Sequence, residues 1–223
     1  MVYLLFLAIS VLVLILITHL VGLYFPQASL LVRHQCSYCQ FPFKTGDLLL
    51  CSSNSPKDKF LCSVKRKWCG LENEIIAGHL AVVWVHPTSH MVYVWEMLFN
   101  GPTLRSIHNL NWQKYSYFVK PINKALSSEK VKNVINVQYN YRYNKHFLLH
   151  FLMAPYFLRT NEHYKKGLEL DATRHCSAFA YELYMNEGVF PCVNNVNLVF
   201  PGTFLNTIPK NGYAFGDLVE LKK

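Results

Sequence analysis

The fold is decided by residues 77–97, AGHLAVVWVHPTSHMVYVWEM. Both halves, 78–85 and 91–97, are rich in the β-branched and aromatic residues that are typical of strands, and the short segment 86–90 separates them. Two such runs joined by a short turn indicate a β-hairpin. The predicted hairpin carries His79 at the start of its first strand and Glu96 near the end of its second.

The register of this hairpin determines whether the two side chains meet. If Val85 pairs with His90 across a four-residue loop, His79 lies directly opposite Glu96. Opposed residues of an antiparallel pair point to the same face, with Cβ atoms roughly 5 Å apart. Glu96 could then accept the imidazole N–H and stabilise the charged ring. A slip of one residue would place the side chains on opposite faces, so the prediction depends on the loop length.

A helix is predicted to begin near Cys176. Its apolar residues recur at helical spacing: Cys176, Phe179, Ala180, Leu183 and Tyr184. Asp171 and Thr173 could cap its start, and Gly188 is expected to end it. The N–H groups and the dipole of a helix N-terminus favour an anion, so a thiol placed there ionises more readily.

Cys176, His79 and Glu96 together are the parts of a cysteine hydrolase: nucleophile, base and orienting carboxylate. The backbone N–H groups of the helix could stabilise an oxyanion. Each residue taken singly is more often structural, and the buried cysteine on an apolar helix face is more often a small core residue. His175 adjoins the cysteine, but neighbouring residues of a helix point about 100° apart.

The remaining pattern predicts an α+β domain in which an antiparallel sheet packs on the helix that carries the nucleophile. The other expected elements are a turn at 44–47 with a buried strand after it, a strand at 115–120, a helix from Ser127, a second helix at 144–158, turns at Pro209 and Asn211–Gly212, and a last strand at 217–221.

Residues 1–25 are expected to form a transmembrane anchor, residues 26–43 a linker and residues 44–223 the catalytic domain. The first segment is apolar apart from Ser10, Thr18 and His19, and about 20 apolar residues span a bilayer. A cleaved signal peptide is the alternative, but no basic residue precedes the run and no Ala-x-Ala follows it. Arg33 and Lys44 after the span place the domain on the cytoplasmic side.

The net charge of +9 does not indicate nucleic-acid binding, because the basic residues do not form one dense cluster. For an anchored protein, a basic surface suits the anionic lipid of a bilayer. Seven cysteines are present, five of them between Cys36 and Cys69. The CxxC formed by Cys36 and Cys39 lacks a second pair at zinc-ribbon spacing, so free or structural thiols are expected rather than a metal site, and no cofactor is expected.

Several segments, in order, resemble the circularly permuted branch of the NlpC/P60 papain-like superfamily, which includes bacterial lipoprotein-like hydrolases and proteins of poxviruses and other large DNA viruses. These are the Gly-Asp strand at 45–50, the histidine strand at 78–83, the strand of the polar partner at 92–96, the nucleophile helix at 176–180 and the C-terminal end at 209–217. The base-before-nucleophile order fits this branch. The cysteine-rich segment 36–69 lies outside the family pattern.

The resemblance implies a papain-like fold and thiol hydrolase or acyltransferase chemistry on amides or esters, with Cys176 as nucleophile, His79 as base and Glu96 as orienting residue. Relatives act on peptides or on lipid acyl groups, and the expected anchor favours a membrane-facing acyl substrate. A viral or virion-membrane origin is also implied. The alternative is a catalytically silent viral membrane or virion component that uses the fold for protein contacts.

Overall fold

The computed structural model describes residues 34–53, 55, 79–144, 173–193, 196–199, 204 and 207–223. In chain order they form β1 (His34–Ser37), β2 (Leu48–Ser53), β3 (His79–Val85), β4 (Val92–Leu98), β5 (Gly101–Ser106), η1 (Ile107–Asn109), β6 (Tyr115–Lys120), α3 (Ser128–Gln138), β7 (Arg142–Tyr143), β8 (Thr173–Arg174), α6 (Cys176–Asn186), η2 (Val196–Leu198) and β9 (Val219–Lys222).

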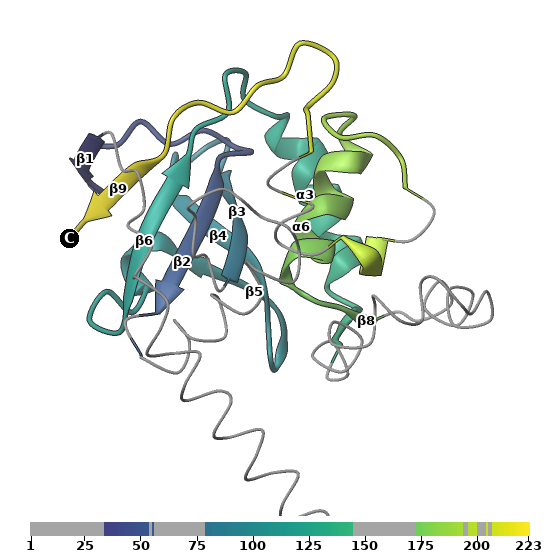
Figure 1. The fold of residues 1–223 in the computed structure, drawn as a ribbon, viewed down its shortest axis with the longest axis horizontal. Coiled ribbons are helices and arrows are strands. Elements are labelled where there is room, and N and C mark those ends of the chain that lie inside the picture. Colours follow the sequence, from purple (N-terminus) through teal and green to yellow (C-terminus); the bar gives the residue numbers. More distant parts are fainter. Residues whose placement is uncertain are drawn as a thin grey trace, which may run out of the picture.

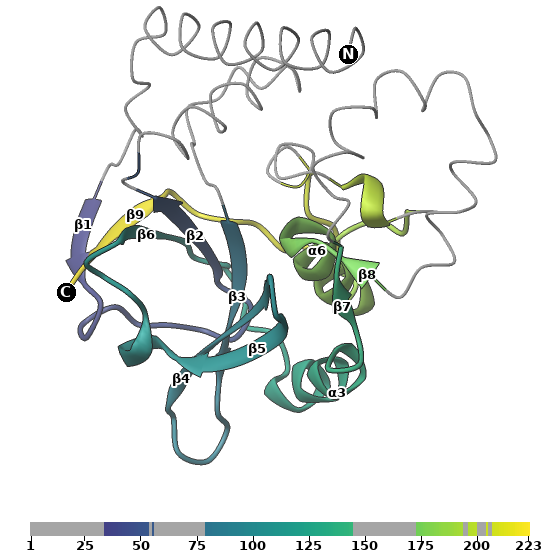
Figure 2. The same cartoon turned by 90° about the horizontal axis from the view of Figure 1, so that it is seen from below.

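Within these residues, seven strands form one sheet in the order β1-β9-β6-β2-β3-β4-β5, and β7 pairs with β8 in a separate two-stranded sheet. In the large sheet only the β1–β9 pair is parallel, and every other pair is antiparallel. The helices α3 and α6 lie together beside the sheet (Figure 1), which curves strongly when viewed from below (Figure 2). The predicted α+β class with a mostly antiparallel sheet is confirmed.

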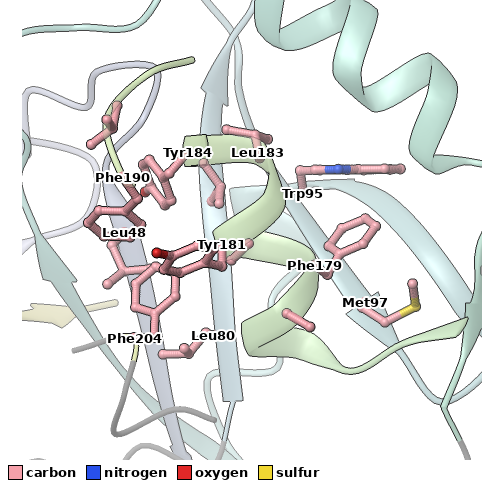
Figure 3. Packing of buried hydrophobic residues seen from close by; sticks show 14 of the residues in the cluster. Leu48, Leu80, Trp95, Met97, Phe179, Tyr181, Leu183, Tyr184, Phe190 and Phe204 are labelled. Carbon is pink, nitrogen blue, oxygen red and sulfur yellow. The ribbon is translucent and has the colours of Figure 1, made fainter. Parts of the chain in front are cut away.

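The two faces of the sheet bury different cores because strand residues alternate. Leu48, Leu80, Val82 and Trp95 belong to the core that also contains the apolar face of α6, and close-up views show its aromatic rings packed around that helix (Figure 3). Intervening residues of β2, β3 and β4, together with Tyr117 of β6, line a second core on the opposite face: Leu49, Cys51, Ala81, Val83 and Val94. Both faces are apolar because each is covered.

Specific hydrogen bonds fix α6 against the sheet. Gln138 of α3 accepts from the Trp95 indole at 2.8 Å and donates to the Phe179 carbonyl of α6 at 3.1 Å. The hydroxyl of Tyr184 donates to the Gly46 carbonyl at 2.8 Å. These groups are buried, so each bond also avoids the cost of an unpaired polar atom. These bonds hold α6 against β4 and against the turn that precedes β2.

The end of α6 follows the predicted glycine stop. Gly188 has φ +71, its N–H donates to the Met185 carbonyl, and the next N–H, from Val189, reaches the Tyr184 carbonyl. This pair of bonds is the Schellman motif, which requires the left-handed conformation that glycine adopts without strain. The prediction at this end of the helix is confirmed.

Most other predicted elements are also confirmed: the strands at β2, β6 and β9, the helix α3 with Ser127 as its N-cap, and the turn at Asn211–Gly212, where φ is +55 and +74. Four strands were not anticipated. The expected linker contains β1, which pairs with β9, and β5 extends the hairpin by a third strand, while β7 and β8 pair with each other. The expected helix at 144–158 lies outside the described residues apart from Asn144.

The predicted anchor at residues 1–25 lies outside the described residues. Within the part of the chain that the structure describes, no helix is both long enough and apolar enough to cross a membrane.

We expect Gly46→Ala to destabilise the domain more than Gly212→Ala. Both glycines have positive φ, +97 and +74, so alanine is strained at either position. A Cβ at Gly46 would also lie 2.6 Å from Leu126 Cγ, whereas a Cβ at Gly212 meets nothing within 4 Å. The added overlap should lower the free energy of unfolding by about 1–3 kcal/mol beyond the loss at Gly212. Urea denaturation of the two variants measures the difference, and equal losses would contradict the packing argument.

Candidate active site

The hairpin of β3 and β4 brings His79 and Glu96 together in a register that differs from the predicted one. Val85 pairs with Val92 rather than with His90, so Ala81, not His79, stands opposite Glu96. The predicted register is wrong by two residues because the connection runs from His86 to Met91, where His90 adopts φ +56. A slip of two keeps both side chains on one face, and they meet as diagonal neighbours.

The two side chains are in direct contact. His79 Nε2 lies 2.7 Å from Glu96 Oε2, a hydrogen bond and an ion pair when the ring is protonated. Glu96 is 1% exposed, whereas 23% of the His79 side chain remains accessible. Burial by itself raises the pKa of Glu96, but the hydrogen bond and charge of His79, together with the charge of Arg105, outweigh it and lower that pKa. Glu96 is therefore an ionised partner for the ring.

Cys176 is the first residue of α6, as the sequence predicted, and it is buried. Burial by itself raises the pKa of its thiol, yet the hydrogen bonds and charges of His175 and of His79 lower that pKa well below the ordinary value. For His79, burial alone would lower the pKa, but Cys176 and Glu96 raise it to about 10. Opposite shifts of this kind are those of a thiolate beside an imidazolium.

The residue that caps α6 is His175, and not Asp171 or Thr173. His175 Nδ1 accepts from the Ala178 backbone N–H at 3.4 Å, and its Nε2 lies 3.1 Å from the Asn197 carbonyl. A backbone N–H can only donate and a carbonyl can only accept, so Nδ1 is the acceptor and Nε2 the donor in these two bonds. Both histidines beside the thiol lower its pKa, and His79 is the one bonded to the Glu96 carboxylate.

Three further polar side chains share the face of His79 and Glu96. Cys51 of β2 pairs directly with His79, and Tyr117 of β6 pairs with Cys51. Arg105 of β5 places Nε 2.5 Å from Glu96 Oε1, as an ion pair whose N–H direction does not align for a hydrogen bond. The sequence predicts a role for none of these three residues.

Burial keeps the neighbouring thiol and phenol neutral. It raises the pKa of Cys51 to about 12, with a further rise from the negative charge of Glu96. Burial also raises the pKa of the Tyr117 hydroxyl. Of the two cysteines beside His79, only Cys176 has the properties of a nucleophile.

Metal binding finds no support among the described residues, which contain no group of three or more His, Cys, Asp and Glu side chains suited to an ion. Cys36 and Cys39 are described as free thiols, while Cys62 and Cys69 lie outside the described ranges.

Compared with protein-family models, with curated proteins and with solved structures, the chain shows no significant match. The class of protein is therefore described from its fold and site alone. It is an α+β domain in which an antiparallel hairpin places a histidine–glutamate pair beside a cysteine at a helix N-terminus.

Proposed function

We propose that this protein is a cysteine hydrolase or acyltransferase that cleaves an amide or ester bond through a thioester intermediate. The observation that carries the proposal is the bonded His79–Glu96 pair placed against a helix-terminal thiol whose pKa is lowered. A nucleophile needs a lowered thiol pKa, a base needs an accessible ring, and an orienting carboxylate needs a bond to that ring. Cys176, His79 and Glu96 fit these three requirements in turn.

The chemistry follows from the groups present. The Cys176 thiolate attacks the carbonyl carbon, and the imidazolium of His79 gives its proton to the departing amine or alcohol. Water or another acceptor then loses its proton to His79 and attacks the thioester, which releases the acyl group and restores the thiolate. Glu96, bound to Nε2, stabilises the ring in its charged state and fixes its orientation.

The start of α6 supplies donors for the oxyanion. The Ala178 N–H is taken by the His175 ring. The N–H groups of Cys176 and Ser177 belong to the first turn, which has no intrahelical acceptors. Donors in this position can bind the negative oxygen that develops at the attacked carbonyl.

The proposal includes the permuted papain-like architecture of the NlpC/P60 superfamily. The antiparallel sheet packed on the nucleophile helix supports it, as does the order of His79 and Glu96 before Cys176. We also propose that the enzyme works at a membrane on a peptide or a lipid acyl group, with its domain facing the cytoplasm, which rests on the apolar run at residues 1–25. A viral origin remains part of the same proposal.

The pH dependence of cysteine alkylation tests this function without a known substrate. We expect iodoacetamide to modify Cys176 at pH 6 at a rate close to that at pH 8, because the lowered pKa keeps the thiolate populated. Peptide mass spectrometry follows each site, and the exposed Cys39 and Cys192 serve as internal references. If Cys176 reacts only as the solution becomes alkaline, no activated nucleophile is present and the proposed function fails.

A further inference from the structure

Arg105 occupies a position symmetrical to that of His79 with respect to Glu96. Glu96 stands opposite Ala81 on β3 and opposite Thr103 on β5. His79 and Arg105 are each two residues from those partners, so both point to the face of Glu96. One carboxylate oxygen, Oε2, contacts the His79 ring at 2.7 Å, and the other, Oε1, contacts Arg105 Nε at 2.5 Å.

A carboxylate with only 1% of its surface exposed needs cationic partners to remain ionised. His79 cannot supply that charge throughout the proposed reaction, because it loses its proton when it protonates the leaving group. Arg105 keeps its charge at every accessible pH. The guanidinium therefore provides a constant positive charge beside Glu96 while the imidazole alternates between its two states.

The other titratable groups coupled to this cluster do not replace that charge. They are Cys51 of β2, Tyr117 of β6 and Cys176 of α6. None of them can be cationic. Among the described residues that face Glu96, the positive charges thus come from His79 of β3 and Arg105 of β5.

We propose that Arg105 is a positioning residue that keeps Glu96 ionised, so that Glu96 can hold the His79 imidazolium beside the Cys176 thiolate. This inference rests on the proposed function and adds a fourth member to its site. Arg105 acts through the carboxylate and need not touch the substrate.

The test is the pH profile of Cys176 alkylation by iodoacetamide in the full chain. In Arg105→Met the acidic midpoint should move to higher pH by about one pH unit or more, since a neighbouring opposite charge lowers a carboxyl pKa by about 1–3. Arg105→Lys keeps the charge and should retain most of the wild-type profile. Arg105→Gln is a second neutral variant, and circular dichroism identifies the variants that are folded.

A double-mutant cycle separates action through Glu96 from a direct effect of charge. In the Glu96→Gln background, adding Arg105→Met should leave the midpoint unchanged, because no carboxylate remains to be kept ionised. A shift of the same size in both backgrounds would overturn the inference, as would a folded Arg105→Met variant with the wild-type profile. If Cys176 of the wild type is unreactive at low pH, the proposed function itself is wrong. That outcome is distinguishable from failure of the Arg105 inference, which requires a reactive wild type.

Discussion

Replacing Cys176 with alanine should abolish the burst of product that the wild type gives with an activated ester. A thioester intermediate predicts rapid release of one equivalent of p-nitrophenolate from a p-nitrophenyl ester, before slower turnover. Without the thiol no acyl-enzyme can form, and the rate should fall by about a thousandfold or more. Stopped-flow absorbance measures the burst, and mass spectrometry locates the acyl group on residue 176.

Cys51→Ala is the matched control for this prediction. Cys51 pairs directly with His79 and is buried, so it tests whether any thiol beside the imidazole would serve. Its pKa is raised to about 12, which leaves almost no thiolate at neutral pH. We expect Cys51→Ala to keep the burst. If Cys51→Ala lost the burst while Cys176→Ala kept it, the nucleophile would be Cys51 and the prediction would be wrong.

Local sequence patterns were sufficient for the elements that carry the candidate site. Runs of β-branched and aromatic residues predicted β3 and β4, and helical spacing predicted α6. The hairpin register could not be predicted with the same certainty. It depends on the conformation of the connection from His86 to Met91. His90 has φ +56 there, and histidine adopts positive φ more often than most residues but far less often than glycine.

The features that were missed depend on contacts distant in sequence. β1 is a strand because β9, at the other end of the chain, provides a parallel edge. His175 caps α6 with a ring that also reaches the distant Asn197 carbonyl, whereas short polar side chains are the usual caps. Arg105 enters the site only because β5 pairs with β4. The cysteine, histidine and glutamate were recognisable by residue type and placement. His175 and Arg105, which lower the pKa values of Cys176 and Glu96, were not.

The second large effect concerns the base. His79→Ala should slow the alkylation of Cys176 at pH 6 by about two orders of magnitude. The positive ring lowers the thiol pKa, so its removal raises that pKa towards the ordinary value of a cysteine and leaves a much smaller fraction of the thiol ionised at pH 6. The acidic limb of the profile therefore moves to higher pH, and the two proteins should react at similar rates above pH 9. An unchanged profile in a folded variant would remove His79 from the site.

His175→Asn is the control that distinguishes the two histidines beside the thiol. Asparagine is a good N-cap, so it can accept the Ala178 N–H in place of the imidazole while removing any charge the ring could carry. We expect this variant to retain more of the reactivity of Cys176 at pH 6 than His79→Ala does, because asparagine keeps the cap bond and His79 keeps its bond to Glu96. If His175→Asn instead raised the acidic midpoint as far as His79→Ala, the activating cation would be the capping histidine. The bond between His79 and Glu96 would then be structural, and His175 rather than His79 would be the residue that activates Cys176.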